Sequence, residues 1–188
     1  MRHDLSLGEV QSLALKATRG AGRSHGMAEE AAFAVRWLVE RGQDGAGALA
    51  TLLQATDGVA EGCPIATGAA LSDAGALQGG MQVKVHCPLL LAPFLVALAD
   101  AEAGVSLAVD DQVVQVGAGG IGGTDMTQTL AEVRIGRCAS PEPCTTVRRA
   151  DVDDATLQIL LDFASRTYAP ATEESRAKGA GAGVTDND

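Results

Sequence analysis

Residues 6–26 read SLGEVQSLALKATRGAGRSHG, and this stretch decides the fold of the N-terminal third of the chain. Ser6 and Glu9 have the spacing of a capping box, in which each side chain satisfies a free backbone N–H of the first helical turn. Apolar residues then recur at helical spacing, so we expect a helix over residues 7–19. The glycines at 20 and 22 should end it.

Two further helices should follow this one. Ser24 can cap the second, whose apolar residues recur at helical spacing before Gly42 ends it. Asp44 can cap the third, which should stop near Gly58. Three short helices joined by tight turns predict a compact antiparallel unit.

Alternating apolar and polar residues, which are typical of strands, occupy much of residues 80–168. Among them an apolar helix is expected from Pro88 to Gly104, with Pro93 marking a kink or its real start. A last helix should be capped by Asp151 or Asp153. The expected strands are residues 83–85, 105–109, 112–116, 127–135 and 145–149, the second and third forming a hairpin that turns at Asp110-Asp111.

These elements predict an α+β fold with a mixed or antiparallel sheet of four to five strands, helices on one side of it, a C-terminal helix and an ordered tail. All 188 residues should form a single domain. Its parts are an N-terminal unit of three short helices (1–58), an α+β part (80–168) and a glycine-rich C-terminal tail (169–188), with a loop carrying one weak strand or helix between the first two.

The composition narrows the function classes. A net charge of −10 with no basic cluster argues against a nucleic-acid partner, which needs a basic face. No membrane is expected, because the most apolar run, residues 89–99, is too short to span a bilayer. The first residues lack the apolar segment of a secretory leader, so we expect a cytoplasmic protein. Only 3% of the residues are aromatic, and the small side chains of the resulting core leave a homodimer open as reinforcement.

Neither a metal nor a cofactor is expected. The four cysteines contain no CxxC pair and the three histidines are scattered, which disfavours a zinc site. A nucleophilic role for Cys63 or Cys87 lacks the pattern of a catalytic triad.

A glycine motif follows the second arm of the hairpin. Residues 117–122 read GAGGIG and fit the GxGxxG fingerprint of dinucleotide-binding proteins. The residues after it have strand periodicity, and no acidic residue stands at the expected distance on a second parallel strand. We therefore interpret the motif as a glycine-rich surface turn.

The joint between the first two helices is the candidate ligand site. Arg19, Arg23, Ser24 and His25 surround exposed backbone next to the N-terminus of a helix. Free amides, the helix dipole and two guanidinium groups all favour a carboxylate or phosphate. An imidazole titrates near neutral pH, so His25 is also a candidate general acid or base. The alternative is that Ser24 is only a helix cap and that the arginines are solvated.

The C-terminal tail completes the hypothesis. It carries Arg176, a glycine run, and the acidic residues Asp186 and Asp188. We expect it to fold back so that these carboxylates meet Arg19 or Arg23 and close a pocket. The alternative is that the acids are simply solvated.

These two stretches also resemble a known family. The chain resembles an uncharacterised bacterial family, domain of unknown function 3726, in five segments. They are LSLGEV at residues 5–10, ATRGAG at 17–22, GMAEEA at 26–31, VRWL at 35–38 and the tail from Thr167 to Asp188. Membership implies no activity. The resemblance places an aromatic residue where this chain has His25, which favours packing over catalysis there. Arg19-Gly20 with Ser24-His25-Gly26 is also similar, over these few residues, to the Ser-His-Gly of malate and L-lactate dehydrogenase-like reductases.

The sequence therefore leaves two function classes open. The first is a small-molecule binding or accessory protein that holds an anion between the 19–26 loop and the tail. The second is a small hydrolase or lyase that uses His25 as acid or base, with Asp186 or Glu29 as its carboxylate partner.

Overall fold

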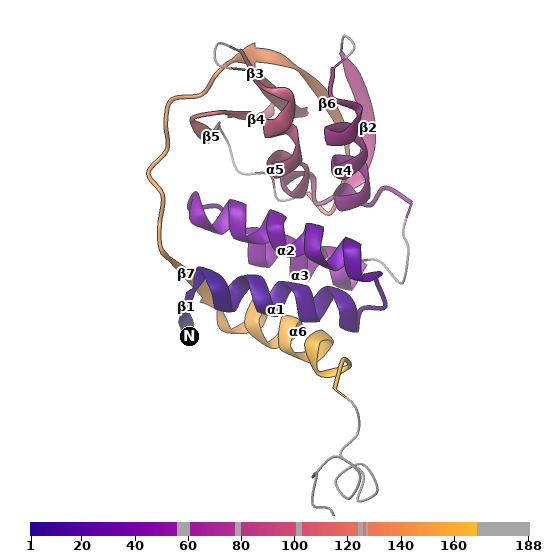
Figure 1. Cartoon of the computed structure of the whole chain (residues 1–188), viewed down its shortest axis with the longest axis vertical. Helices are drawn as coiled ribbons and strands as arrows, with labels where there is room; N and C mark the ends of the chain where they lie inside the picture. The colour runs from indigo at the N-terminus through magenta and orange to yellow at the C-terminus, as the bar shows by residue number, and fades with distance from the viewer. Residues whose placement is uncertain (56–60, 78–79, 101–102, 124–125, 127, 169–188) are drawn as a thin grey trace, which may run out of the picture.

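The computed structural model describes residues 1–55, 61–77, 80–100, 103–123, 126 and 128–168. In this part of the chain, helices and two antiparallel sheets confirm the predicted α+β class. Helices from both the N-terminal and the C-terminal part of the chain lie together in one half of the molecule, and the larger sheet with its covering helices forms the other half (Figure 1).

The predicted N-terminal unit is present as α1 (Leu7–Gly20), α2 (His25–Glu40) and α3 (Gly45–Ala55). The capping box of α1 is complete. The Ser6 hydroxyl accepts from the Glu9 N–H at 3.2 Å, and the Glu9 carboxylate accepts from the Ser6 N–H at 2.7 Å. These bonds satisfy donors that the first turn of any helix leaves free, which is why α1 begins where it does.

The other two helices also begin at the predicted caps. Ser24 Oγ accepts from the N–H of Met27 at 3.3 Å, and Asp44 Oδ1 accepts from the N–H of Gly47 at 2.8 Å. Between α2 and α3, Gly42 has φ 73°, the left-handed conformation that glycine adopts at least cost. The short turn that it makes lets α3 pack back against α2.

The C-terminal helix α6 (Asp154–Ser165) lies alongside α1 (Figure 1). Of the two predicted caps, Asp153 is the one used, because its carboxylate accepts from the N–H of Thr156 at 3.0 Å. A Cβ at Gly20 would overlap the carbonyl oxygen of Phe163 and lie 2.7 Å from its carbon. Glycine at the end of α1 is thus what allows the two helices to approach so closely.

The larger sheet has the strand order β2-β6-β3-β4-β5, and all its neighbours are antiparallel. The predicted hairpin is present and turns at Asp110, which has φ 49°. The fifth strand comes from the glycine-rich residues that sequence reasoning treated as a turn. The strands are β2 (Met81–His86), β3 (Ala103–Val109), β4 (Gln112–Gly117), β5 (Gly120–Gly123) and β6 (Leu130–Ala139).

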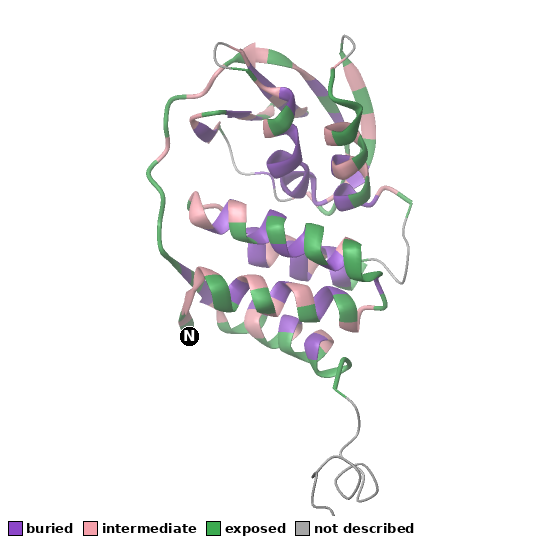
Figure 2. Cartoon of the chain, viewed as in Figure 1, coloured by how far each residue is buried: buried purple, intermediate pink, exposed green. Residues whose placement is uncertain are grey.

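Short helices cover the sheet on the side that faces the helical half. They are α4 (Pro64–Ala74), η1 (Pro88–Leu91), α5 (Ala92–Leu95) and η2 (Val96–Leu98). The single helix expected from Pro88 to Gly104 is therefore wrong in length, because a new helical turn begins at Ala92, immediately before Pro93, and the helical residues end at Leu98. These helices, the sheet and α2 all contribute buried residues to the hydrophobic core, coloured purple in Figure 2.

A second sheet pairs a strand at the N-terminus with a strand just before α6. In it β1 (Arg2–Ser6) runs antiparallel to β7 (Arg149–Asp153). The strand predicted at residues 145–149 is thus misplaced, since pairing with β1 begins only at Arg149. A bond from Arg149 Nε to the carboxylate of Asp4, 2.6 Å long, supports the pairing.

The tail from residue 169 to 188 lies outside the described residues. The prediction that it is ordered and docks on the helical joint therefore stays a prediction.

Candidate anion site at the ends of three helices

The candidate joint is a tight turn between α1 and α2. The N–H groups of Ala21 and Arg23 donate to the carbonyls of Ala17 and Thr18, at 2.9 and 3.2 Å, which folds the end of α1 over itself. Ser24 follows as the cap of α2. The hydroxyl of Ser24 therefore accepts a hydrogen bond within its own helix, as expected of a helix cap.

The two arginines of the joint lie differently. Arg23 is only 6% exposed and faces a small cavity that Thr18 and Cys63 also line. Arg19 is exposed, and its Nη1 donates to the carbonyl of Arg23 at 3.0 Å. Of this pair, Arg19 is the one available to a ligand from solvent.

An open pocket of about 350 Å³ brings Arg19 and His25 together with cationic residues from two other places in the sequence. Lys16 lies one turn before Arg19 on α1, and Arg166 follows α6. Leu15 and Thr167 complete the lining. The pocket therefore lies where α1 and α6 end and α2 begins, and it gathers positive charge in a protein whose net charge is −10.

Aromatic rings and a carbonyl, rather than carboxylates, hold the cations of this pocket. Lys16 Nζ lies 5.8 Å from the centre of the Tyr168 ring, and the guanidinium of Arg166 lies 4.3 Å from that of Phe163. Among the described residues, no carboxylate lies within 4.0 Å of the charged nitrogens of Lys16, Arg19 or Arg166. Cations near the C-terminal ends of α1 and α6 also complement the helix dipoles, which helps to explain their position.

The imidazole of His25 has one carboxylate neighbour. Its Nε2 lies 3.4 Å from Glu29 Oε1, one turn further along α2. Both side chains are largely exposed, at 68% and 60%. Such an exposed pair lacks the dry surroundings in which general acid–base groups are usually held.

Sequence reasoning found Arg19 and His25 but missed Lys16 and Arg166. The sequence did contain a signal for Lys16, since it stands three residues before Arg19 and residues three apart share one face of a helix. No local signal exists for Arg166, because only the packing of α6 on α1 brings it near. The predicted tail residues Arg176, Asp186 and Asp188 lie outside the described part of the chain.

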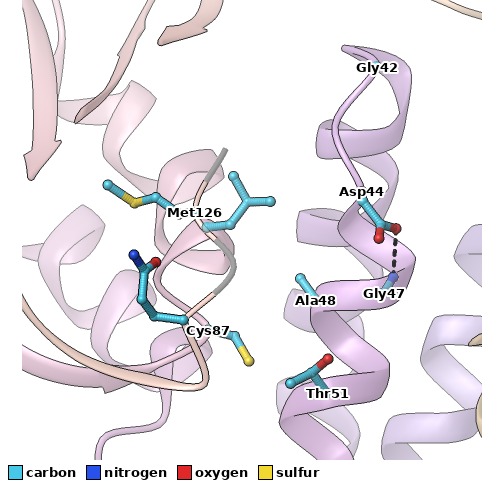
Figure 3. A pocket seen from close by; sticks show the side chains of 9 residues that line it. Gly42, Asp44, Gly47, Ala48, Thr51, Cys87 and Met126 are labelled. Carbon is cyan, nitrogen blue, oxygen red and sulfur yellow. Dashed lines mark hydrogen bonds between the residues drawn. The ribbon is translucent and has the colours of Figure 1, made fainter. Parts of the chain in front are cut away.

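A second pocket, of about 340 Å³, separates α3 from the turn after β2 (Figure 3). Asp44, which precedes α3, and Thr51, which lies on α3, line one side of it, and Cys87 lines the other side. Cys87 has φ 43°, an unusual conformation for a residue other than glycine. Burial raises the pKa of its thiol to about 11, so the nucleophilic thiolate is scarce at neutral pH.

Of the glycine motif at residues 117–122, only Ala118 and Gly119 form the turn between β4 and β5, because Gly117 ends β4 and residues 120–122 belong to β5. Its glycines pack against the segment that joins β6 to β7. A Cβ at Gly119 would lie 3.1 Å from the carbonyl oxygen of Pro141, and one at Gly120 would overlap Cys144 Sγ. The motif therefore has a packing role, and a strand rather than a crossover helix follows it.

Two searches of the described residues complete the survey of sites. No cluster of three or more His, Cys, Asp or Glu side chains suited to a metal ion occurs among them. No helix in the same residues is both long enough and apolar enough to cross a bilayer.

Comparison with known proteins gives one match. Residues 5–72 match the family described as protein of unknown function (DUF3726). No curated protein and no solved structure matches the chain. The matched segment covers α1, α2 and α3 and ends within α4, so the resemblance of the C-terminal tail stays a prediction. The resemblance expected from the sequence is thus confirmed over residues 5–72, where the chain matches the model of DUF3726.

Proposed function

We propose that the protein is a small-molecule binding or accessory protein whose ligand is an anion held at the pocket of Lys16, Arg19, His25 and Arg166. One observation carries the proposal. The basic side chains of Lys16, Arg19 and Arg166 line one pocket, and no carboxylate of the described residues pairs with any of them. Arg and Lys placed in this way favour a carboxylate or phosphate, since each guanidinium keeps several N–H donors for it.

The surrounding elements support this use of the pocket. The N-terminus of α2 adds the positive end of a helix dipole beside His25. Aromatic contacts hold Lys16 and Arg166 in place, which lowers the cost of ordering them around a ligand.

Titration calorimetry at low ionic strength tests the proposal with inorganic phosphate, malonate and acetate as probes. We expect saturable binding of at least one of them, weakened about two- to tenfold by Arg166→Gln or Lys16→Gln. Arg134→Gln, which removes an exposed charge from β6, is the matched control and should leave binding unchanged. Absence of binding by all three probes would remove the proposal.

The second candidate, a small hydrolase or lyase, draws on one observation: the proximity of Glu29 to His25. In that function His25 would act as acid or base and Glu29 would orient it. His25→Gln should then abolish turnover of a bound anionic substrate while leaving its affinity nearly unchanged. Loss of affinity alone would favour binding.

Three expectations from the sequence accompany this proposal: a cytoplasmic location, a bacterial source and a homodimer. Sedimentation of the purified chain tests the last of these directly.

A further inference from the structure

We propose that the ligand is amphiphilic: a small monocarboxylate whose charged group binds at the basic pocket and whose apolar chain lies along the groove between α1 and α6. The inference rests on the proposed function and adds the class of ligand. It comes from a third cavity that shares Lys16 with the basic pocket.

This groove has a volume of about 490 Å³, and residues of α1 and of the α6 segment line it. Its apolar lining consists of Leu13, Leu161, Ala164 and Tyr168. Leu161 is 44% exposed and Tyr168 is 64% exposed. Large apolar side chains gathered at a groove in this way suit an apolar ligand group.

Lys16 connects the two cavities. It lines both, and its ammonium group faces the ring of Tyr168 at the end of the groove. A ligand lying along α1 therefore passes from apolar side chains to a cluster of cations. The stretch from Glu9 to Arg19 is ten residues, about 15 Å of helix, which accommodates a medium-length alkyl chain.

The charges of the groove fix the ligand's orientation and limit it to one charged end. Glu9 and Asp162 line the groove, and both carboxylates already accept hydrogen bonds, from the Ser6 N–H at 2.7 Å and the Gln158 side chain at 3.2 Å. They disfavour a second negative charge on the ligand. A single carboxylate is thus favoured at the Lys16 end, and a dicarboxylate of similar length is not.

Calorimetric titration of the full chain with acetate, octanoate, octanedioate and octylammonium tests this inference. A buried methylene contributes about fourfold in affinity, so even partial burial should make octanoate at least about 30-fold tighter than acetate. Octanedioate and octylammonium should both bind more weakly than octanoate.

The failures of the two proposals are distinguishable. If acetate and octanoate bind equally, the anion site stands and the amphiphilic ligand is overturned. If neither binds, the amphiphilic ligand is overturned, and the anion site falls with it only if phosphate and malonate also fail to bind. If octylammonium binds as tightly as octanoate, the groove is a nonspecific apolar surface and the inference fails.

Matched variants locate the binding. Leu161→Asn should weaken octanoate but not acetate, whereas Arg166→Gln should weaken both. Leu130→Asn on β6 is the control, since Leu130 is 45% exposed and lies outside the groove. Sedimentation of the Leu161 variant adds a second readout. A dimer that dissociates on this substitution, with octanoate affinity unchanged, would assign the face to a second copy of the chain and overturn the inference.

Discussion

At the residue scale, single glycines decide which helices touch. Gly20 has no room for a side chain, because a Cβ there would overlap the backbone of Phe163. Gly8 lies in the same helix, and a Cβ there would meet only Ser6 Oγ, at 4.0 Å. Two chemically identical substitutions in α1 should therefore have opposite effects on stability.

We predict that Gly20→Ala lowers the free energy of unfolding by about 1–3 kcal/mol, since the backbone of α6 must move to admit the methyl group. Gly8→Ala should be neutral or raise it by up to about 1 kcal/mol, because alanine favours the helix. Urea titrations followed by circular dichroism measure both. Equal effects of the two substitutions would contradict the close approach of α1 and α6.

At the element scale, the capping box gives α1 a dependence on pH. The hydrogen bond from the Ser6 backbone N–H, followed by that to the Ser6 side chain, lowers the pKa of Glu9 below its ordinary value of 4.5. A lowered pKa means that the folded state favours the carboxylate. The stability that Glu9 contributes is thus present above pH 4.5 and is lost as the pH falls through the lowered pKa.

Glu9→Gln keeps an oxygen for the Ser6 N–H but removes the titration. We predict that the fall in melting temperature on acidification below pH 4.5 is shallower in this variant than in the parent. Glu30→Gln, an exposed change in α2, is the control. If Glu9→Gln leaves the pH dependence of the melting temperature unchanged, the capping box does not have this role in solution.

The segment between β6 and β7 offers a second test at this scale. It runs along the side of the molecule from the sheet to the helical half (Figure 1). Its Cys144 N–H donates to the Gly119 carbonyl at 3.3 Å, and its Val147 N–H donates to the Glu40 carbonyl at 2.7 Å. The glycine turn is thus one of the points that hold this connection in place.

We predict that Gly120→Ala lowers the free energy of unfolding by about 1–3 kcal/mol, because φ there is 138° and the new methyl group would meet Cys144. The displaced segment should also expose Cys144, so its labelling by a maleimide, followed by mass spectrometry, should become faster. Gly122→Ala is the control, since its Cβ would make an ordinary contact with Pro141 at 3.6 Å. An unchanged labelling rate in the Gly120 variant would contradict this packing.

At the scale of the whole molecule, the notable feature is that positive charge gathers at one pocket of an acidic protein. The chain is acidic overall, yet its basic pocket lies beside Thr167 and Tyr168, just before the tail that carries Asp186 and Asp188. If the tail acids occupy this pocket, they compete with the proposed anion.

Deletion of residues 180–188 tests that competition. We predict a lower melting temperature without ligand, because the pocket loses its acidic partner, and a higher affinity for phosphate. Asp186→Asn with Asp188→Asn should reproduce both effects while keeping the length of the tail. Unchanged stability and affinity in both variants would show that the tail does not reach the pocket.

The sequence by itself determined the local structure: the caps at Ser6, Ser24 and Asp44, the hairpin at Asp110 and the helical unit of the N-terminal third. These features depend on hydrogen bonds and backbone preferences within a few residues, so the order of side chains is enough to reveal them. Sequence reasoning made two errors of extent: it predicted too long a helix around Pro93, and it placed the strand that begins at Arg149 too early in the chain. Three features emerge only in the folded chain: α6 packs on α1, β1 pairs with β7, and Arg166 joins Lys16 and Arg19 at one pocket. Those contacts join residues more than a hundred positions apart, and their formation depends on how whole surfaces fit together, which no local pattern records.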